Sequence, residues 1–173
     1  DKSGRWLDMC AGPGGKAAML QAGISPSGGV LDCLEPLPNR ADLVRQALNP
    51  KLQANVMVGY GQDAKAGFYD AVLLDAPCSG LGSVRRKPES RWRKTTEQLS
   101  GLTKTQSELL AAAAKALKSG GYLLYSTCSP LVIETNTQIK QLLDTHLELE
   151  LVNANEVLNR ISPALGMSTT RKT

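Results

Sequence analysis

This sequence lacks the features that mark membrane proteins, secreted proteins and zinc proteins. No apolar run approaches the roughly 20 residues that a membrane-spanning helix needs, and no charged-then-apolar leader opens the chain. The chain has a single histidine, His146, and no Cys-x-x-Cys pair. We therefore expect no membrane partner and no metal site, and we interpret His146 as a residue at a helix end without a chemical role.

The four cysteines, Cys10, Cys33, Cys78 and Cys128, are widely spaced along the 173 residues. A disulfide framework is not expected in a chain with 42% hydrophobic residues, which is enough for one domain with a real core. We predict reduced thiols and a cytoplasmic protein. Because the first residue is Asp1 and not Met, we also expect the chain to be a piece cut from a longer protein.

The positive charge of the chain is concentrated in one short tract. The net charge is +4, but the tract 85–94 alone carries six cations against one acid, which is 6 − 1 = +5. Such a patch favours a polyanion partner, although an arginine-rich solvated loop would have the same charge. An aromatic residue inside the tract favours stacking on bases. We therefore name an RNA-binding set: Arg85, Arg86, Lys87, Arg91 and Trp92.

Apolar runs alternate with helical patterns along most of the chain. The patterns predict strands at 5–10, 28–35, 52–59, 69–76 and 122–128, with a further alternating strand at 147–152. Helices are predicted at 15–23, 39–49, 102–121 and 131–146. This order predicts one α/β domain over residues 1–173, with a doubly wound and mostly parallel sheet.

A glycine-rich loop follows the first predicted strand. Ligands of doubly wound sheets bind at the carboxyl ends of the strands, so this loop is a candidate binding site. A phosphate-binding P-loop would need Gly at position 10 and Ser or Thr at position 17, and is excluded by Cys10 and Ala17. The loop matches the looser dinucleotide fingerprint, which a tight strand-to-helix turn would also satisfy. Glu35 ends the next strand, where an acid can accept two ribose hydroxyls. Loop and acid fit NAD and S-adenosylmethionine (SAM) equally well, and Asp63 could receive an adenine amino group.

Two thiols follow the fourth and fifth predicted strands, in "DAPCSG" and "STCS". Because these strand ends are neighbours in a doubly wound sheet, we expect Cys78 and Cys128 to face one pocket. A thiolate that adds to C6 of a pyrimidine turns C5 into a nucleophile for a methyl donor, and Asp75 is placed to stabilise charge at N3. A small buried hydrophobe is the simpler interpretation of each cysteine alone. The sequence does not show which group deprotonates the nucleophile.

These segments resemble the signature motifs of the RNA cytosine-C5 methyltransferases: "LDMCAGPGGKAA", "DAPCSGLGSVRRKPESRWRK" and "YSTCSP". The Sun (Fmu) branch, which methylates 16S ribosomal RNA, is the most similar. The resemblance implies a Rossmann-like SAM-dependent methyltransferase fold, with Cys128 as nucleophile and Cys78 assisting product release. It also implies a SAM site, formed by Cys10, Ala11, Gly12, Pro13, Gly14, Gly15, Lys16, Glu35, Asp63 and Asp75. "ETN" at 134–136 resembles a further segment of the family, in which Asn136 matches.

The chain departs from the family pattern in several places. The ribose acid is Glu35 instead of Asp, and "QDA" replaces the usual residues around Asp63. The resemblance further implies an amino-terminal RNA-binding domain and carboxy-terminal strands that this chain lacks. We therefore expect a catalytic core cut at both ends, with weak RNA affinity and little activity by itself. Two alternatives stay open: an NAD-dependent oxidoreductase, and a noncatalytic RNA-binding module on the same fold.

Overall fold

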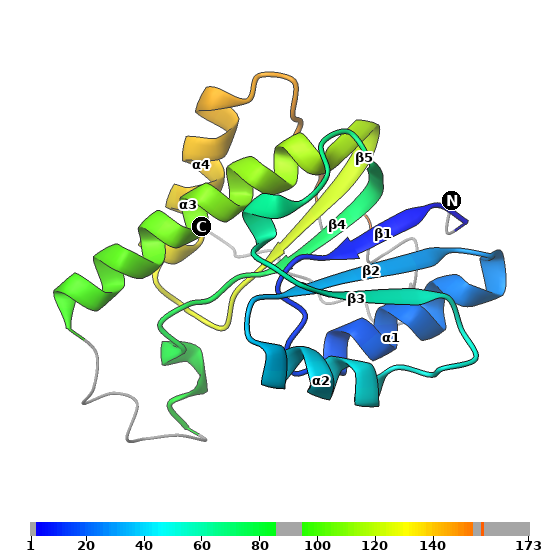
Figure 1. Ribbon diagram of the computed structural model, residues 1–173. Coiled ribbons are helices and arrows are strands. Elements are labelled where there is room, and N and C mark those ends of the chain that lie inside the picture. Colours follow the sequence, from blue (N-terminus) through cyan, green and yellow to red (C-terminus); the bar gives the residue numbers. More distant parts are fainter. Residues whose placement is uncertain (1–2, 86–94, 154–156, 158–173) are drawn as a thin grey trace.

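The computed structural model describes residues 3–85, 95–153 and 157. Its centre is a sheet with the strand order β3-β2-β1-β4-β5, in which every neighbouring pair is parallel (Figure 1). The strands are β1 (Arg5–Asp8), β2 (Val30–Glu35), β3 (Ala54–Val58), β4 (Tyr69–Asp75) and β5 (Leu117–Ser126). The predicted doubly wound α/β fold is thus confirmed. In the described part of the chain, no helix is both long and apolar enough to cross a bilayer.

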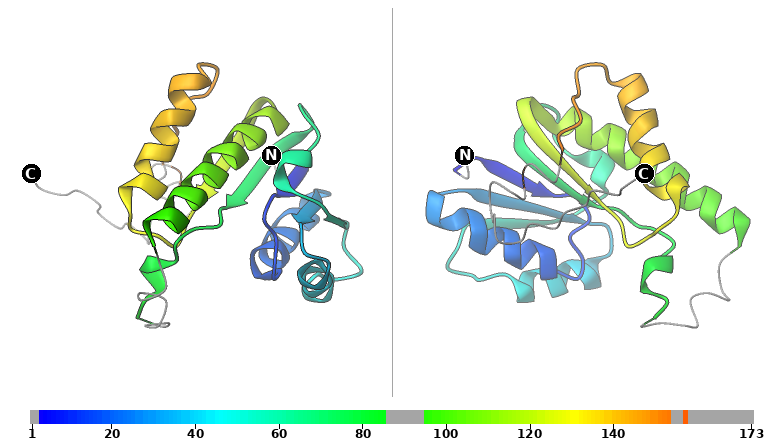
Figure 2. Two further views of the ribbon diagram at one scale, coloured as in Figure 1. Left: turned by 60° about the vertical axis from the view of Figure 1, so that its left-hand side comes forward. Right: turned by 180° about the vertical axis from the view of Figure 1, so that it is seen from behind.

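Two pairs of helices cover the two faces of this sheet (Figure 2). The helices α1 (Gly15–Ile24) and α2 (Pro38–Ala47) pack together on one face, and α3 (Thr96–Ala116) and α4 (Asn136–Thr145) on the other. This arrangement follows from parallel strands, since each return crossing places its helix over the sheet. The chain reverses its winding direction between β1 and β4, and ligands bind at such a switch point in open α/β sheets.

The strands bury apolar side chains on both faces, so the core has two halves. Under α3 and α4 lies a cluster that includes Leu7, Leu74 and Leu110, and under α1 and α2 a second one that includes Leu31 and Val44. All five side chains are at most 1% exposed. Full burial of one such side chain is worth roughly 1.5–3 kcal/mol. The central strands therefore form a rigid platform for the loops at their ends.

The boundary between α3 and β5 differs from the sequence prediction of a helix over 102–121. The helix begins earlier because Thr95 and Gln98 form a capping box, with Gln98 N donating to Thr95 Oγ1 at 3.3 Å. It also ends earlier, at Ala116, because Leu117 pairs with Tyr69 of β4. The pairing then shifts, so that Ala71 faces Tyr122 and the predicted stop at Gly120-Gly121 lies inside β5 as an irregularity. Tertiary pairing thus overrides a helical pattern.

The predicted strand at 147–152 is wrong, since residues 147–153 form turns and irregular backbone. Alternation alone does not produce a strand when the segment has no neighbouring strand to pair with. The preceding helical prediction, 131–146, divides into a short 3₁₀ helix η5 (Val132–Glu134) and α4. His146 caps the end of α4 and its Nδ1 lies 2.9 Å from Glu148 Oε1, so it is a helix-end residue as predicted.

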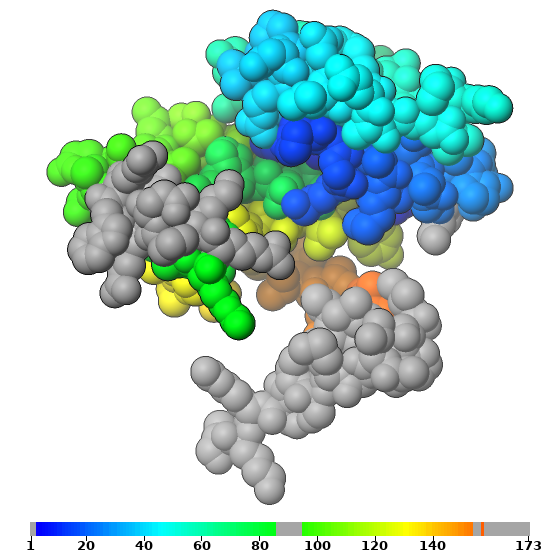
Figure 3. Space-filling model, turned by 90° about the horizontal axis from the view of Figure 1, so that it is seen from below, coloured from blue at the N-terminus to red at the C-terminus, as the bar shows by residue number. Residues whose placement is uncertain are grey.

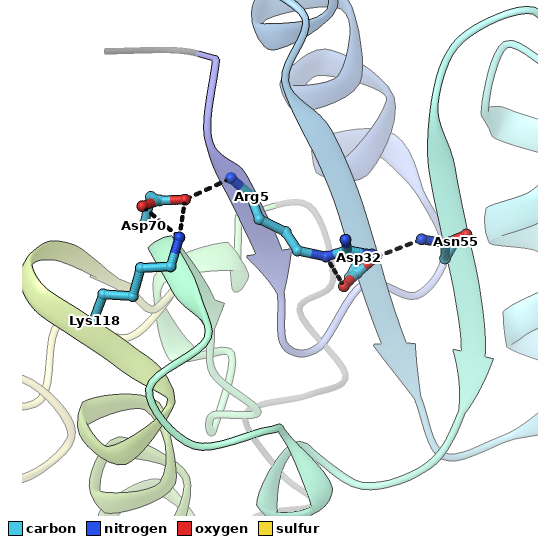
Figure 4. Close-up of polar contacts among 5 residues, drawn as sticks. All are labelled: Arg5, Asp32, Asn55, Asp70 and Lys118. Atoms are coloured by element: carbon cyan, nitrogen blue, oxygen red, sulfur yellow. Dashed lines mark hydrogen bonds and ion pairs between the residues drawn. The ribbon is translucent and has the colours of Figure 1, made fainter.

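The amino-terminal edge of the sheet has its own set of polar contacts (Figure 4). Arg5 Nε donates to Asp32 Oδ2 at 2.8 Å, and Asn55 Nδ2 donates to Asp32 Oδ1 at 2.7 Å. Burial acts to raise the pKa of Asp32, but the hydrogen bonds from Arg5 and Asn55 outweigh it and lower the pKa. Asp70 accepts from Lys118 Nζ at 2.8 Å. Because these charges satisfy one another, we interpret this edge as structural.

Candidate active site

The opposite, carboxyl-terminal edge carries the loops singled out from the sequence. Figure 3, which views the molecule from below, shows blue, green and yellow segments side by side, although they are far apart in the chain. The loop after β1 bonds to both neighbouring strands, with Met9 N donating to Leu73 O at 2.9 Å and Ala11 N donating to Leu34 O at 3.0 Å. The backbone thus holds the glycine loop at the switch point before α1 begins.

The two thiols predicted to share a pocket are in direct contact. Cys78 Sγ and Cys128 Sγ lie 3.2 Å apart, close enough for a hydrogen bond between them, and both cysteines are free. Burial and the hydrogen bond to Cys128 raise the pKa of the Cys78 thiol, so Cys78 keeps its proton. Cys128 is exposed and lines an open cavity of about 750 Å³. A reagent that enters this cavity reaches Cys128 directly, with a protonated thiol beside it.

A glycine in the 3₁₀ helix η3 (Leu81–Ser83) allows the backbone to approach the Cys128 loop. Gly82 N donates to Cys128 O at 2.9 Å. A Cβ atom on Gly82 would lie 2.5 Å from that carbonyl oxygen, a distance that side-chain carbons do not reach without a shift. The glycines after Cys78 therefore serve to bring the β4 loop against the β5 loop.

An ion pair lies beside the thiols. Lys16 Nζ donates to Asp75 Oδ2 at 2.5 Å, which links the start of α1 to the end of β4. The hydrogen bond to Asp75 raises the pKa of Lys16, and the negative forms of Asp8 and Cys128 add to the rise. A Lys16 ammonium and a Cys128 thiolate therefore attract each other. Lys16 is in the predicted cofactor loop, and it also has an electrostatic interaction with Cys128.

Glu35 is brought against the glycine loop, as its predicted place at the end of β2 requires. Gly12 N donates to Glu35 Oε2 at 3.2 Å and Leu37 N donates to Glu35 Oε1 at 3.1 Å. Arg40 Nε lies 3.7 Å from the same carboxylate, and Arg40 Nη2 donates to Gly12 O at 2.5 Å. Glu35 is 2% exposed, so a ribose would have to replace some of these contacts.

Asp8 is a buried acid at the end of β1 that the sequence did not single out as a site residue. It is 1% exposed, and neither carboxylate oxygen has a hydrogen-bond partner among the described residues. Burial raises the pKa of Asp8 to about 7, and the charge of Asp75 adds to the rise. The backbone amide of Cys10, whose contact with the carboxyl group falls short of a hydrogen bond, and the charge of Lys16 oppose the rise in pKa. An unpaired buried carboxyl group is costly unless a ligand compensates for it. The site therefore fits a ligand that brings positive charge to Asp8.

The remaining predicted residues are placed as follows. Asp63, exposed in the short helix η2 (Gly61–Asp63), accepts from Tyr60 N at 2.9 Å. Arg85 is exposed and lines the cavity with Cys128. Asn136 is exposed at the start of α4. Four members of the predicted RNA-binding set lie outside the described residues: Arg86, Lys87, Arg91 and Trp92.

Sequence reasoning missed the most buried acid near the thiols. In "ETN" the family match pointed to Asn136, but Glu134 is the residue with 0% exposure and contacts to both cysteine loops. No local signal in the sequence marks this burial, because Val132 and Ile133, which directly precede Glu134, are exposed.

A family model described as 16S rRNA methyltransferase RsmB/F matches residues 1–170. The chain belongs to this family. Ribosomal RNA small subunit methyltransferase B of Yersinia enterocolitica is 38% identical over 156 residues, which are 87% of this chain and 36% of that protein. A Mycobacterium tuberculosis protein, whose name calls it a methyltransferase and states no substrate, is 45% identical over 145 residues, covering 83% of this chain and 32% of its own length.

Two solved structures have the same fold. The crystal structure of PH0851 superposes with a TM-score of 0.77 at 30% identity, over 83% of this chain and 34% of that one. NSun6 from Pyrococcus horikoshii, determined with SFG, has a TM-score of 0.71 at 25% identity, over 83% of this chain and 38% of that one. The fold is therefore the Rossmann-like fold of SAM-dependent methyltransferases. The chain spans about a third of the length of the curated relatives it matches.

Proposed function

We propose that this RsmB/F-family chain is the catalytic core of an enzyme that transfers a methyl group from SAM to C5 of a cytosine in RNA. The observation that carries the proposal is the 3.2 Å contact between Cys78 Sγ and Cys128 Sγ at an open cavity. The oxidoreductase alternative leaves this thiol pair unexplained. The names of the small-subunit relatives favour 16S ribosomal RNA over transfer RNA as the substrate.

The residues around the glycine loop fit SAM as the cofactor. SAM, when bound, supplies a methyl group on a positively charged sulfur. The unpaired Asp8 carboxyl group can interact with such a cation when it is ionised. It is the last residue of β1, directly before the loop that includes 10–16. We assign the ribose to Glu35 at the end of β2 and the adenine amino group to Asp63 after β3, which follows the usual order of ligand-binding loops in such sheets. This charge distribution favours a cationic cofactor over NAD, whose pyrophosphate is negative.

Cys128 is the nucleophile of the proposed reaction. Its thiolate adds to C6 of the cytosine, a C–S bond forms, and the electron pair of the C5–C6 bond becomes available at C5 to form the bond to the methyl carbon. The bond from that carbon to the sulfonium sulfur would break in the same step, with its electron pair left on the sulfur. The charge of Lys16 attracts a Cys128 thiolate, and we assign to Asp75, held by Lys16 at 2.5 Å, the role of stabilising the charge that develops at N3 of the base. In this proposal Lys16 acts on the nucleophile and Asp75 acts on the ring.

Cys78 serves the second half of the reaction. After methyl transfer the proton on C5 must leave, and the electrons of that C–H bond restore the C5–C6 double bond while the Cys128–C6 bond breaks. The raised pKa keeps Cys78 protonated until this stage, so it can donate its proton to the departing Cys128 sulfur. The Cys78 thiolate that results accepts the proton that leaves C5, so both thiols end the reaction protonated. The 3.2 Å separation between the sulfurs allows the proton transfer between them without a loop movement.

Positive charge at the rim of the cavity is suited to the RNA backbone. Arg85 lines the cavity beside Cys128, and the basic tract continues from it in the sequence. A base inside a structured RNA must leave its stack to reach a thiol in a pocket, which costs a few kcal/mol. Phosphate contacts from Arg85 and its neighbours would hold the strand in the distorted state.

Trapping with RNA that contains 5-fluorocytosine tests the proposal. Fluorine at C5 cannot leave as a proton does, so the Cys128–C6 bond should persist as a covalent protein–RNA adduct when SAM is present. The full-length protein that carries this chain should form the adduct, and Cys128→Ala should abolish it. Cys33→Ala is the matched control, because Cys33 is a buried core thiol with 0% exposure and should leave adduct formation intact.

The outcomes separate the alternatives. A SAM-dependent adduct that requires Cys128 supports the enzyme. Tight RNA binding without any adduct would contradict the catalytic proposal and support a noncatalytic RNA-binding module. Calorimetric binding of NAD in place of SAM would support the oxidoreductase interpretation and overturn the cofactor assignment.

A further inference from the structure

Glu134 is a fully buried carboxylate close to the two thiols. It ends the 3₁₀ helix η5, in the segment between the Cys128 loop and α4, and is 0% exposed. A buried carboxylate destabilises a protein unless several hydrogen bonds compensate for the loss of water. The hydrogen-bond partners of Glu134 therefore show what its burial is for.

The partners of Glu134 are the residues that follow the two cysteines. Ser79, directly after Cys78, donates its backbone N to Glu134 Oε1 at 2.7 Å and its hydroxyl to Oε2 at 2.5 Å. Ser129, directly after Cys128, donates its hydroxyl to Oε2 as well. The two hydroxyl oxygens are also 3.2 Å apart. One carboxylate thus joins the β4 loop to the β5 loop, one residue away from each sulfur.

Rigid elements hold Glu134 itself in place. Gln106, a fully buried residue of α3, donates its Nε2 to Glu134 Oε1 at 3.1 Å and to Pro77 O at 2.8 Å. The Tyr125 hydroxyl of β5 donates to the backbone oxygen of Glu134 at 2.8 Å. Burial acts to raise the pKa of Glu134, but the hydrogen bonds from Ser129, Ser79 and Gln106 outweigh it, so the pKa is lowered and the group is ionised.

We propose that Glu134 is a positioning residue that sets the distance between the Cys78 and Cys128 sulfurs by holding Ser79 and Ser129 on one carboxylate. It touches neither thiol nor any reacting atom. The inference rests on the proposed function, in that the spacing matters because Cys78 assists release of the product from Cys128. A carboxylate suits this position because it accepts from every donor around it in charge-assisted hydrogen bonds, whereas a neutral amide would lose that charge and could keep the serine hydroxyl contacts only by reversing their direction.

Thiol crosslinking tests the spacing without RNA or SAM. Dibromobimane becomes fluorescent when two neighbouring thiolates each displace one bromide, so its fluorescence reports the Cys78–Cys128 pair. The other two cysteines are poor competitors, since burial raises the pKa of Cys10 to about 12 and also raises that of Cys33. Glu134→Gln should slow crosslinking at least about tenfold, the effect of roughly 1.4 kcal/mol. Crosslinking at the wild-type rate would overturn the proposal.

The matched control is Asp32→Asn in the full chain. Asp32 is 3% exposed and hydrogen-bonded by Arg5 and Asn55 at the opposite edge of the sheet (Figure 4). This substitution removes a buried, paired carboxylate far from the thiols, and should lower the melting temperature without slowing crosslinking. Equal slowing in both variants would mean that Glu134 contributes only general stability.

Serine variants keep the test decisive if Glu134→Gln does not fold. Ser79→Ala and Ser129→Ala each remove one hydroxyl from the carboxylate and should each slow crosslinking by a smaller factor. Combining the two should give less than the product of the single effects if both act through Glu134, whereas independent effects multiply. Wild-type crosslinking in both serine variants would contradict the proposal.

Methyl transfer separates this inference from the proposed function. In the full-length protein, Glu134→Gln should still form the 5-fluorocytosine adduct, but kcat should fall at least about tenfold and KM for RNA should fall in proportion, because release, the step that needs Cys78, follows methyl transfer. Glu134-dependent crosslinking in a protein that never forms an adduct would sink the methyltransferase assignment and leave the positioning role standing. Adduct formation together with crosslinking that does not depend on Glu134 would support the methyltransferase assignment and overturn the positioning role.

Discussion

Lys16 Nζ lies 2.5 Å from Asp75 Oδ2 and bridges the switch point of the sheet, from the first turn of α1 to the last residue of β4. The two residues are 49% and 32% exposed, so water weakens the pair and it adds little to stability. The importance of the ion pair comes from the groups that surround it. A cation at this point faces the proposed cofactor site, the acid of β4 and the Cys128 thiol together.

Replacing Lys16 with Met should reduce the reactivity of Cys128 more than it reduces stability. Loss of the ammonium removes roughly 1 kcal/mol of attraction for the thiolate, so the alkylation rate of Cys128 by iodoacetamide at pH 7.5 should fall about fivefold. Peptide mapping by mass spectrometry separates Cys128 from Cys78. Lys104→Met is the control, since Lys104 also forms an exposed ion pair, with Glu108 on α3. A fall of the same size in the control would contradict a specific role.

Replacing Gly82 with Ala should displace the loop that carries the thiols. The new Cβ would lie 2.5 Å from Cys128 O, so the β4 and β5 loops must separate, and we expect a loss of about 1–3 kcal/mol in the free energy of unfolding. Methyl transfer should fall with it. Denaturant unfolding and an activity assay check both effects. Gly101→Ala has no atom within 4 Å of its new Cβ in α3 and should stabilise the helix by about 0.5–1 kcal/mol.

Replacing Asp8 with Asn should change how stability depends on pH. The folded pKa of about 7 is raised from 3.8, so folding favours the protonated acid, and stability present below about pH 4 is lost as the pH rises toward 7. Without cofactor, Asp8→Asn should therefore be more stable than wild type at pH 8, by at most about 4 kcal/mol, and equally stable near pH 3. Urea unfolding across this range measures the difference. SAM should bind the variant more weakly. If the difference in stability between the variant and wild type did not change with pH, titration of Asp8 could not be its cause.

Reversing the charge of Arg85 should weaken RNA binding in a salt-dependent way and leave SAM binding unchanged. Loss of one phosphate contact should reduce the slope of log K against log salt by about 0.7–1. Fluorescence anisotropy with a ribosomal RNA oligonucleotide, titrated at several salt concentrations, gives this slope. Lys51→Glu makes the same charge change just before β3, at the amino-terminal edge. Equal loss of RNA affinity in Lys51→Glu, or loss of SAM binding in Arg85→Glu, would mean that Arg85 acts through net charge or structure.

Most of the fold followed from local patterns in the chain. Apolar runs without alternation marked β1, β2 and β4, because strands buried on both faces favour apolar residues at successive positions. The helix–strand boundary at Leu117 and the absence of a strand at 147–152 did not follow, because pairing partners decide them and these are distant in sequence.

The candidate site was likewise predictable in part from the sequence. Loops after parallel strands converge at one edge whatever the details, so Cys78 and Cys128 could be placed near each other from strand order alone. The roles of Asp8 and Glu134 were not visible, because a carboxyl group in the sequence looks the same whether it is solvated, unpaired or surrounded by donors.

The sequence by itself determined which chemical groups stand at the carboxyl ends of the strands, since strand order and loop composition are local properties. Only the tertiary structure decided the 3.2 Å between the two sulfurs, the Lys16–Asp75 pair and the carboxylate that joins Ser79 to Ser129. Distances of this kind depend on how side chains from separate elements pack against one another, and packing is settled by the whole fold at once.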